Sequence, residues 1–323
     1  MILVTGSAGF IGFHLCKKLL GEHEVIGVDD FNSYYNPKLK EERNKILKQN
    51  NKFKLMRMDF GKLTKKDIKN VDIIFHKAAY AGVRYSIENP LLYDETNVHN
   101  TVKLLKLAVD SNVKKIIYAS SSSVYGNVKK FPTPETQPVN PVSPYGVSKL
   151  SGEKYCDAFY NCFGINTISL RYFTVYGPWG RPDMFIMSLI ESTLGKGTLT
   201  RFKKEGKIVG FKRDFSFIDH IVEANILAMK STIKNDVFNV ASGKNTPIND
   251  LIEIIKKETG KDPKCIEAEA TEADPLVTWG DISKIKDKLG YRHPTTIEEG
   301  FKKTLEWYKN FNSNLGDREF CGF

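Results

Sequence analysis

Short strand-like runs alternate with longer amphipathic stretches along the N-terminal half of the chain. The runs lie at residues 1–4, 25–28, 54–58, 73–76, 116–119 and 167–171, and the first of them is entirely apolar. Helical patterns separate most of these runs, most clearly at residues 91–111 and 145–163. Strands that alternate with helices indicate βαβ crossovers, and all-apolar strands are typical of a sheet buried on both faces. The pattern therefore predicts an α/β fold built on a doubly wound parallel sheet.

The pattern changes after Thr174. Residues 177–182 are typical of a rigid loop and residues 203–212 of a flap or hairpin, while helices are predicted at 218–231, 247–259 and 296–311, the second of them capped by Thr246. A strand-like run at 238–241 is expected to return to the main sheet. We therefore expect a smaller, interleaved C-terminal α/β substrate domain of residues 176–212 and 243–323, beside a larger domain of residues 1–175 to which about 213–242 return.

Composition excludes several classes of function. The chain of 323 residues has 41% hydrophobic residues, enough for a sizeable core. Its net charge of +10 comes from lysines spread along the chain rather than from one patch, so we expect no nucleic-acid partner. Five cysteines without C-x-x-C spacing and six scattered histidines predict no disulfide framework and no metal. With no apolar run of membrane-spanning length, we expect a cytoplasmic protein without a membrane partner.

A glycine-rich turn follows the first strand, where Thr5-Gly6-Ser7-Ala8-Gly9-Phe10-Ile11-Gly12 begins a helical pattern. Glycines at such positions let the turn be tight, let backbone N–H groups approach a pyrophosphate, and let helix and strand pack closely. The second strand ends at Asp29, where a carboxylate suits the ribose hydroxyls of a dinucleotide. Because no arginine adjoins Asp29, this Rossmann-type pattern favours NAD over NADP.

Several candidate residues lie where predicted strands end. They are Asp59, Ala78, Ala79, Ser120–Ser123 and Tyr172–Thr174. Because ligands of open α/β sheets lie beyond the carboxyl ends of the strands, one cleft can hold all of these residues. A purely structural interpretation of the serine run, as a polar loop that satisfies backbone groups, stays open.

Tyr145 and Lys149 are four residues apart. If Ser143 and Pro144 begin a helix, the two side chains share one face. A tyrosine acting as a base near neutral pH needs its pKa lowered by about 3 units, or roughly 4 kcal/mol, and a nearby ammonium favours the phenolate. With 14 tyrosines in the chain, the spacing can also arise by chance.

Nearly the whole chain resembles the extended short-chain dehydrogenase/reductase family. The turn at residues 5–12 is similar to its cofactor fingerprint, and Ser121, Tyr145 and Lys149 to its catalytic set. Within that family the nucleotide-sugar 4-epimerases are most alike, and four stretches resemble the UDP-glucuronate 4-epimerases: residues 81–90, 120–126, 171–184 and 213–219.

The resemblance implies an enzyme that inverts C4′ of a UDP-sugar, most simply converting UDP-glucuronate to UDP-galacturonate through a transient 4-keto sugar. Tyr145 would take the 4′-hydroxyl proton, Ser121 would hold that oxygen, and Lys149 would hold the nicotinamide ribose. The expected NAD-binding residues are Gly6, Ala8, Gly9, Phe10, Ile11, Gly12, Asp29, Asp59, Ala78, Ala79, Asn97, Tyr145, Lys149 and Tyr172.

The resemblance also implies a set of substrate-binding residues. Ser122, Ser123 and Thr174 would donate to the sugar carboxylate, because hydroxyls bind it without pinning the ring as a bidentate arginine would. Arg181 and Arg213 would face the uridine or diphosphate end. Arg84 and Asp274 complete the expected set. The two long helices are plausible surfaces for a homodimer.

The chain departs from the family pattern at four positions. Lys77 replaces a usually apolar residue, Tyr80 stands where glutamine is common, and Thr271 stands where arginine or glutamine is common. Thr278, small at a position that resembles a pocket gate, would admit a bulkier substituent. A UDP-glucose or UDP-N-acetylglucosamine 4-epimerase is therefore the alternative.

Two further alternatives are less consistent with the sequence. A dehydratase or decarboxylase of the same family needs a carboxylate near the active-site serine, and Ser122 and Ser123 supply none. A non-catalytic dinucleotide-binding protein on the same fold would be expected to have lost Tyr145 or Lys149, and both are present.

Overall fold

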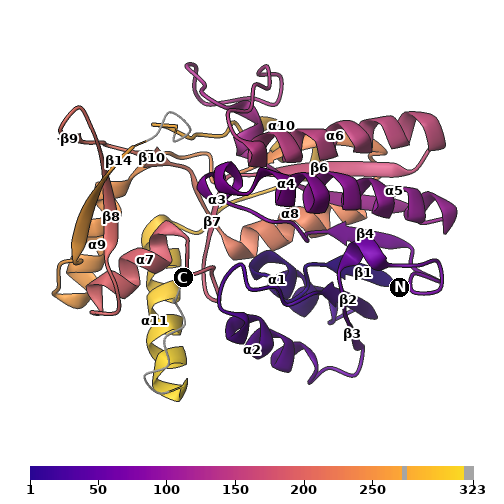
Figure 1. Ribbon diagram of the computed structural model, residues 1–323, viewed down its shortest axis with the longest axis horizontal. Coiled ribbons are helices and arrows are strands. Elements are labelled where there is room, and N and C mark those ends of the chain that lie inside the picture. The colour runs from indigo at the N-terminus through magenta and orange to yellow at the C-terminus, as the bar shows by residue number, and fades with distance from the viewer. Residues whose placement is uncertain (271–274, 316–323) are drawn as a thin grey trace.

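A seven-stranded parallel sheet forms the centre of the molecule (Figure 1). The computed structural model describes residues 1–270 and 275–315, with side chains up to residue 311. The strand order is β12-β6-β5-β4-β1-β2-β3. These strands are β1 (Ile2–Thr5), β2 (Val25–Asp29), β3 (Phe53–Arg57), β4 (Ile73–His76), β5 (Lys115–Ser121), β6 (Asn166–Tyr172) and β12 (Asn235–Val240). The predicted doubly wound sheet is confirmed, and β12 joins it beside β6 from far along the chain.

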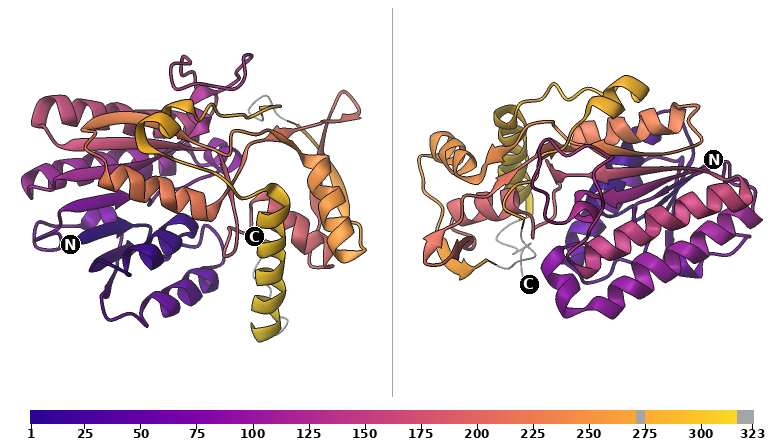
Figure 2. Two further views of the ribbon diagram at one scale, coloured as in Figure 1. Left: turned by 180° about the vertical axis from the view of Figure 1, so that it is seen from behind. Right: turned by 90° about the horizontal axis from the view of Figure 1, so that it is seen from above.

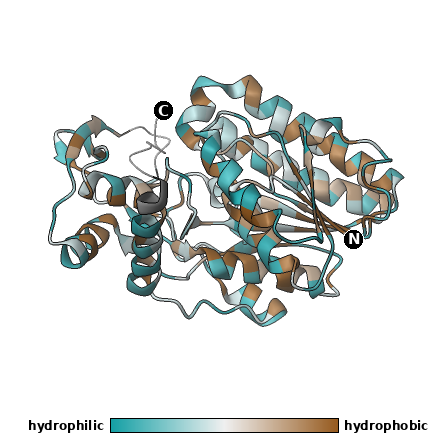
Figure 3. Ribbon diagram, turned by 90° about the horizontal axis from the view of Figure 1, so that it is seen from below, coloured by the Kyte–Doolittle hydropathy of each residue, from teal (hydrophilic) through white to brown (hydrophobic). Residues whose placement is uncertain are grey.

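Helices cover both faces of the sheet. On one face lie α1 (Phe10–Leu19) and α8 (Ile218–Lys230), with α2 (Pro37–Leu47) packed against α1, and on the other lie α5 (Asn100–Asp110) and α6 (Pro144–Phe163). Successive strand residues enter different cores: Ile116 and Tyr118 pack with the α5–α6 side, and Ile117 with the α1–α8 side. This alternation follows from the two-residue period of a strand. Figure 3 shows the consequence, apolar strands between helices that are polar on the outside.

The stretch expected to be one helix from residue 91 to 111 is divided. It forms α4 (Pro90–Tyr93), a π-helical turn (Asp94–His99) and α5, and it follows the short α3 (Val83–Glu88). π-Helical turns occur mostly as single turns near functional sites. Here the turn contains Asn97, which bonds to the main chain of Tyr80. An apolar pattern alone does not distinguish a π turn from an α-helix, so the division escaped the sequence analysis.

A second group of elements lies beside the sheet, beyond the carboxyl ends of its strands (Figure 2). It contains α7 (Phe185–Thr193), α9 (Ile248–Thr259), α11 (Ile297–Leu315) and the small sheet β14-β8-β9, made by Cys265–Glu269, Leu199–Lys204 and Lys207–Ile208. Two strand pairs connect it to the main sheet, β7 (Thr174–Tyr176) with β11 (Phe215–Phe217) and β10 (Lys212–Arg213) with β13 (Thr246–Pro247). Short helices at Phe60–Lys62, Ser122–Tyr125 and α10 (Ser283–Leu289) complete the described elements.

Two predicted details of this region come out differently. The hairpin expected within residues 203–212 begins earlier, as β8 and β9. Thr246 does not cap α9: it pairs with Arg213 in the β10–β13 ladder, and Pro247, which has no side-chain donor or acceptor, occupies the cap position. The helix begins at Ile248, one residue later than expected, so Thr246 lies one residue before the cap position.

None of the described helices combines the length and the apolar composition needed to cross a bilayer.

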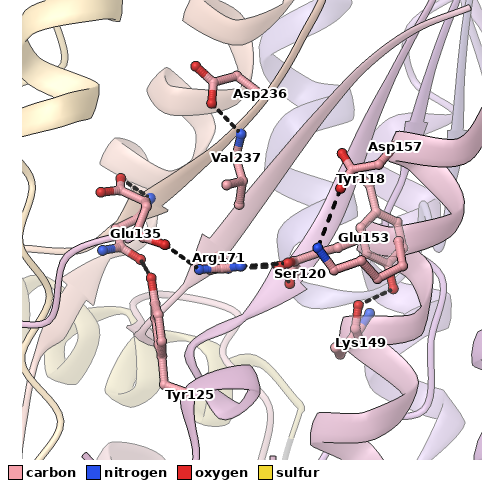
Figure 4. Close-up of polar contacts among 12 residues, drawn as sticks. Tyr118, Ser120, Tyr125, Glu135, Lys149, Glu153, Asp157, Arg171, Asp236 and Val237 are labelled. Carbon is pink, nitrogen blue, oxygen red and sulfur yellow. Dashed lines mark hydrogen bonds and ion pairs between the residues drawn. The ribbon is translucent and has the colours of Figure 1, made fainter. Parts of the chain in front are cut away.

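A buried ion pair joins α6 to the sheet (Figure 4). Arg171 of β6 donates from Nε and Nη2 to the two carboxylate oxygens of Glu153, at 2.9 and 2.7 Å, and both side chains are about 5% exposed or less. The Ser120 hydroxyl donates to the same carboxylate. The two parallel hydrogen bonds and the third one from Ser120 compensate the buried charges for the contacts with water that they have lost.

We expect Glu153→Gln to lower the free energy of unfolding by about 3–5 kcal/mol, because Arg171 then keeps a buried charge without its partner. Equilibrium unfolding in urea measures the change. The matched control is Glu41→Gln, which breaks the exposed 2.8 Å pair with Arg57 and should cost less than about 1 kcal/mol. Equal losses in the two variants would show that the buried pair contributes nothing special.

Candidate active site

A cavity of about 1060 Å³ opens at the carboxyl ends of the sheet strands. Its walls come from the turn after β1, from the ends of β2, β4, β5 and β6, and from β8, β10 and α9 of the second region. Pockets for one drug-sized ligand usually measure roughly 300–1,000 Å³. The volume lies at the upper end of this range, and the walls come from both regions of the chain.

The glycine-rich turn at one end of the cavity has backbone that a side chain would obstruct. Gly6 has a φ of +70°, and a Cβ there would lie 2.8 Å from the backbone nitrogen of Ala78. A Cβ on Gly12 would lie 2.0 Å from the Gly6 carbonyl oxygen. Gly6, Gly9, Phe10, Ile11 and Gly12 line the cavity. Because α1 begins at Phe10, its unpaired N–H groups lie at this turn, and the geometry fits a dinucleotide pyrophosphate.

Asp29 lies at the end of β2 on the cavity wall. Its carboxylate accepts hydrogen bonds from the backbone N–H groups of Ala8 (3.0 Å) and Phe31 (2.9 Å). Burial raises the pKa of Asp29. The Lys40 ammonium, 3.8 Å from the Asp29 carboxylate, opposes this shift. The fixed carboxylate retains acceptor capacity for ribose hydroxyls. Lys40, eleven residues after Asp29, is a cation of this site that the sequence did not indicate.

Helix α6 presents Tyr145 and Lys149 to the cavity. Ser143 caps the helix, accepting a hydrogen bond from the backbone N–H of Gly146 at 3.1 Å, and Pro144 is its first residue, as predicted. The Lys149 ammonium donates to the Ala119 carbonyl oxygen at 2.8 Å. Burial lowers the pKa of Lys149 to about 7, against the opposing charge of Glu153.

The pKa of Tyr145 is not lowered as the sequence analysis expected. Burial raises it, and a hydrogen bond with Ser121 and the positive charge of Arg181 pull it down only in part. The cation that acts on Tyr145 here is therefore Arg181. Lys149 is not among the groups that shift the pKa of Tyr145.

Ser121, Ser122, Ser123 and Thr174 all line the cavity, as Tyr145 does, and Ser121 interacts with Tyr145. Ser121 ends β5 and caps the following short helix: its hydroxyl oxygen accepts from the Ser123 backbone N–H and donates to the Ser123 hydroxyl, both at 3.1 Å. The structural interpretation of the serine run therefore holds in part. The remaining hydroxyl capacity faces the cavity, where a ligand can use it.

The three predicted arginines line the cavity at different places. Arg181 forms a bidentate pair with Asp183 and lies over the Tyr34 ring, 5.3 Å from its centroid. Arg213 donates to the carbonyl oxygens of Lys212 and Leu276, and Arg84 lies 3.9 Å from the centroid of the Phe202 ring. Arg181 also lies near enough to Tyr145 for its charge to act on that phenol. Its expected place at the uridine or diphosphate end stays a prediction.

Some predicted residues do not reach the cavity. Within the described chain, Ala8 and Asn97 are not among its lining residues. Ala8 is 1% exposed and supports Asp29 through its backbone. Asn97 bonds to the Tyr80 backbone in both directions at 2.9 Å and to the Ser148 hydroxyl at 3.0 Å, contacts that hold the loop in place. Its expected role in NAD binding stays a prediction.

Two of the sequence positions discussed above, Thr271 and Asp274, lie outside the described residues. Thr278, the suggested gate, is likewise not among the described lining residues, and its hydroxyl accepts from the Asp214 backbone N–H at 3.4 Å. The other predicted residues on the wall are Asp59, Ala78, Ala79 and Tyr172. The described residues contain no cluster of three or more side chains able to hold a metal ion.

Several wall or supporting residues were missed. Tyr34 donates to the Ala81 carbonyl oxygen at 2.6 Å and touches Asp183 and Arg181. Lys77, noted above only as a departure from the family pattern, donates to the Tyr172 hydroxyl. Glu153, four residues after Lys149, could have been found from helical spacing, because it shares the face of Tyr145 and Lys149.

Comparison with known proteins agrees with this geometry. Residues 2–241 match the model of the NAD dependent epimerase/dehydratase family. The chain is 37% identical over 313 residues to a UDP-glucuronate 4-epimerase of Thermodesulfobacterium geofontis strain OPF15, covering 95% of each protein.

Two solved structures are similar over almost their whole length. The UDP-glucuronic acid 4-epimerase from Bacillus cereus, in complex with UDP-glucuronic acid and NAD, has a TM-score of 0.90 and 34% identity, covering 96% of this chain and 99% of that one. The UDP-N-acetylglucosamine 4-epimerase from Methanobrevibacter ruminantium M1, in complex with UDP-N-acetylmuramic acid, has a TM-score of 0.86 and 30% identity, with coverage of 96% and 98%. On the nucleotide-binding turn, the Tyr–Lys–Ser group and these matches, the chain belongs to the NAD dependent epimerase/dehydratase family.

Proposed function

We propose that this protein is an NAD-dependent UDP-sugar 4-epimerase whose substrate is UDP-glucuronate, with UDP-galacturonate as product. The single observation that carries the proposal is the meeting of two sets of groups in one cavity: Tyr145, Lys149 and Ser121 on one side, and the hydroxyls of Ser122, Ser123 and Thr174 next to them. The identities of 34–37% with proteins named UDP-glucuronate or UDP-glucuronic acid 4-epimerases support it.

Different residues carry the different parts of the proposed reaction. Tyr145 takes the proton of the sugar 4′-hydroxyl, and Ser121, already hydrogen-bonded to Tyr145, holds the oxygen that loses it. Lys149, fixed on the Ala119 carbonyl, is placed to bind the cofactor ribose. Bound NAD supplies reversible oxidation of the sugar carbon, so that the reaction has no net redox change.

The cavity holds the dinucleotide at its other end. The turn at Gly6, Gly9 and Gly12 would bind the pyrophosphate, and Asp29 the adenosine ribose. This leaves the wall made by β8, β10 and α9 for the nucleotide part of the sugar substrate, where Arg213 and Arg84 supply positive charge.

Hydroxyl donors suit the uronate carboxylate. A sugar ring that turns over between the loss of its C4′ hydride and the return of that hydride must present its carboxylate in two orientations, and hydroxyls reorient to follow an acceptor. Arg181 suits this role less well, because Asp183 already binds its Nε–Nη2 edge. The alternative substrates are UDP-glucose and UDP-N-acetylglucosamine, the second favoured by the similarity to the Methanobrevibacter enzyme.

The substrate is tested by incubating the purified protein and NAD separately with UDP-glucuronate, UDP-glucose and UDP-N-acetylglucosamine. Proton NMR of the anomeric region follows each mixture. We expect a new UDP-galacturonate signal from UDP-glucuronate, because only that sugar uses the Ser122, Ser123 and Thr174 hydroxyls fully. Turnover of the neutral sugars alone would assign the site to the alternative.

Tyr145→Phe should lower turnover by about 10²–10⁴-fold, the usual contribution of a positioned acid–base group. The cofactor affinity should stay within a few-fold, because the phenol is not needed for the glycine turn or Asp29. Initial-rate assays measure the turnover, and a fluorescence titration measures the affinity for NAD. The matched control is Tyr155→Phe on the outer side of the same helix, which should leave the rate unchanged; a Tyr145→Phe enzyme with full activity would remove Tyr145 from the mechanism.

We also propose the two-domain division expected from the sequence, with residues 1–175 and about 213–242 for NAD and residues 176–212 and 243–323 for the sugar nucleotide. The place of β12 in the large sheet and the separate small sheet β14-β8-β9 support this division.

We further propose that the protein is a homodimer formed through α6. Val147, Tyr155 and Phe163 are 50%, 39% and 52% exposed on this helix, and a shallow hollow runs along it. The hollow is lined by Val147, Leu150, Ser151, Lys154, Tyr155 and Ala158. Apolar patches of this kind on a soluble protein commonly mark interaction sites.

Tyr155→Glu should convert the dimer to a monomer, because it places a charge in the apolar centre of the proposed interface. Sedimentation velocity over a range of protein concentrations measures the change. Ile266→Glu, at an exposed apolar residue of β14, is the control and should leave the dimer intact. A monomeric wild-type protein at all concentrations would contradict the proposal.

A further inference from the structure

Lys77 is a basic side chain in the wall of the cavity for which the proposed mechanism has no use. It directly follows β4, and its backbone N–H donates to the carbonyl and the hydroxyl oxygens of Thr5 at the end of β1. Its ammonium group donates to the Ile117 carbonyl oxygen and to the Tyr172 hydroxyl, both at 3.1 Å. The side chain also lies over the Tyr172 ring, 5.5 Å from the centroid.

The partners of Lys77 are all neutral. Among the ion pairs found in the described part of the chain none involves Lys77, whereas Lys149 lies near a carboxylate, that of Glu153. The Tyr172 hydroxyl is itself committed to Asn225, which is 0% exposed. A protonated Lys77 therefore has its charge uncompensated by any described carboxylate at this end of the cavity.

Lys77 and Lys149 are close neighbours. Their ammonium groups bond to carbonyl oxygens two residues apart on β5, Ile117 and Ala119, a spacing of roughly 6.6 Å along a strand. Burial lowers the pKa of Lys77 well below its ordinary value, and the charge of Lys149 lowers it further. The neighbouring titratable groups also include His76 on β4, whose low pKa keeps it neutral, and Tyr172 on β6.

The nicotinamide end of a dinucleotide bound at the glycine turn must reach Tyr145 and Lys149 for the proposed reaction. That end of the cavity is the one that Lys77, Ala119 and Tyr172 line together. The nicotinamide ring is positively charged in NAD⁺ and neutral in NADH. A lysine beside it accepts a proton more readily when the ring is reduced, because like charges no longer oppose each other.

We propose that Lys77 is a positioning residue of the cofactor site, which stabilises the reduced form of bound NAD relative to the oxidised form by gaining a proton when the cofactor is reduced. The proton comes from solvent and returns to it on oxidation, so that Lys77 itself is neither oxidised nor reduced. This inference rests on the proposed function only in that the cavity holds NAD, and it explains why a lysine occupies this strand end.

The test is a redox titration of the NAD-loaded protein without any sugar. The protein is equilibrated with redox couples of known potential, and the near-ultraviolet absorbance of bound NADH gives the reduced fraction. In Lys77→Met, whose flexible side chain fills a similar volume, the ratio of NADH to NAD⁺ at a fixed potential should fall by about tenfold. That change equals a potential lower by about 30 mV for two electrons.

The sign of the pH dependence follows from the proton uptake. Reduction raises the pKa of Lys77, so the advantage of wild type over Lys77→Met should grow as pH falls towards the acidic side and shrink at alkaline pH. Lys77→Arg, which keeps a positive charge, should also hold the potential above that of Lys77→Met. An unchanged potential in Lys77→Met would overturn the proposal.

Two further measurements keep the test decisive. Lys115→Met is the matched control, because the Lys115 ammonium also bonds to main-chain carbonyl oxygens, those at the end of α8, away from the cavity; an equal shift there would refute a local effect. If Lys77→Met holds NAD too weakly to titrate, the dissociation constants of NAD⁺ and NADH for Lys77→Gln report the same ratio. The titration uses no UDP-sugar, so it can fail while the epimerase assay succeeds, and the reverse.

Discussion

The close approach of α6 to β5 is the constraint on which the site depends. A Cβ on Gly152 would lie 2.1 Å from the Tyr118 hydroxyl, so only glycine lets the helix lie this near the strand. One turn before Gly152, Lys149 donates to the Ala119 carbonyl oxygen. Glu153, the residue after Gly152, accepts hydrogen bonds from Ser120 and Arg171. Successive turns of one helix face are thereby joined to successive residues of one strand.

This contact determines the electrostatics of the cavity. Burial lowers the pKa of Lys149 to about 7 and raises that of Tyr145, so the protein by itself keeps the phenol protonated. Ser121 and Arg181 oppose the effect on Tyr145. Forming the phenolate near neutral pH therefore needs a further positive charge at this end of the cavity, and in the proposed reaction the oxidised nicotinamide is the group that brings one. The base would then be active chiefly when the oxidised cofactor is in place.

The fold was largely predictable because its signals are local. Apolar strands, the glycine turn and the Ser143-Pro144 start of α6 each depend on neighbours in sequence, and the structure has them where expected. The π turn around Asn97 and the extended backbone at Thr246 depend on partners far along the chain, Tyr80 and Arg213. No periodicity within a single segment contains that information.

Which residues line the site was more predictable from the sequence than how they interact there. Motif spacing brought Tyr145, Lys149 and the serines to one wall, but the direction of the Tyr145 pKa depends on burial, and burial is a property of the assembled cavity. Lys77 illustrates the same limit. Its sequence neighbours gave no reason for a lysine, because its acceptors belong to β5 and β6 and become visible only when the strands are side by side.

The pairing of Arg181 with Asp183 bears most directly on substrate choice. An arginine fork free to bind the sugar carboxylate would hold it in one plane, and a ring held in that way could not present its other face. Asp183 accepts from Nε and Nη2 of Arg181, and the contacts with Asp183 and Tyr34 hold Arg181 near Tyr145. In the proposed function the carboxylate would then be left to Ser122, Ser123 and Thr174, whose hydroxyls rotate with their acceptor. An anion bound by donors that turn with it is compatible with a sugar that must itself turn over, which is the physical reason to favour the uronate over a neutral sugar.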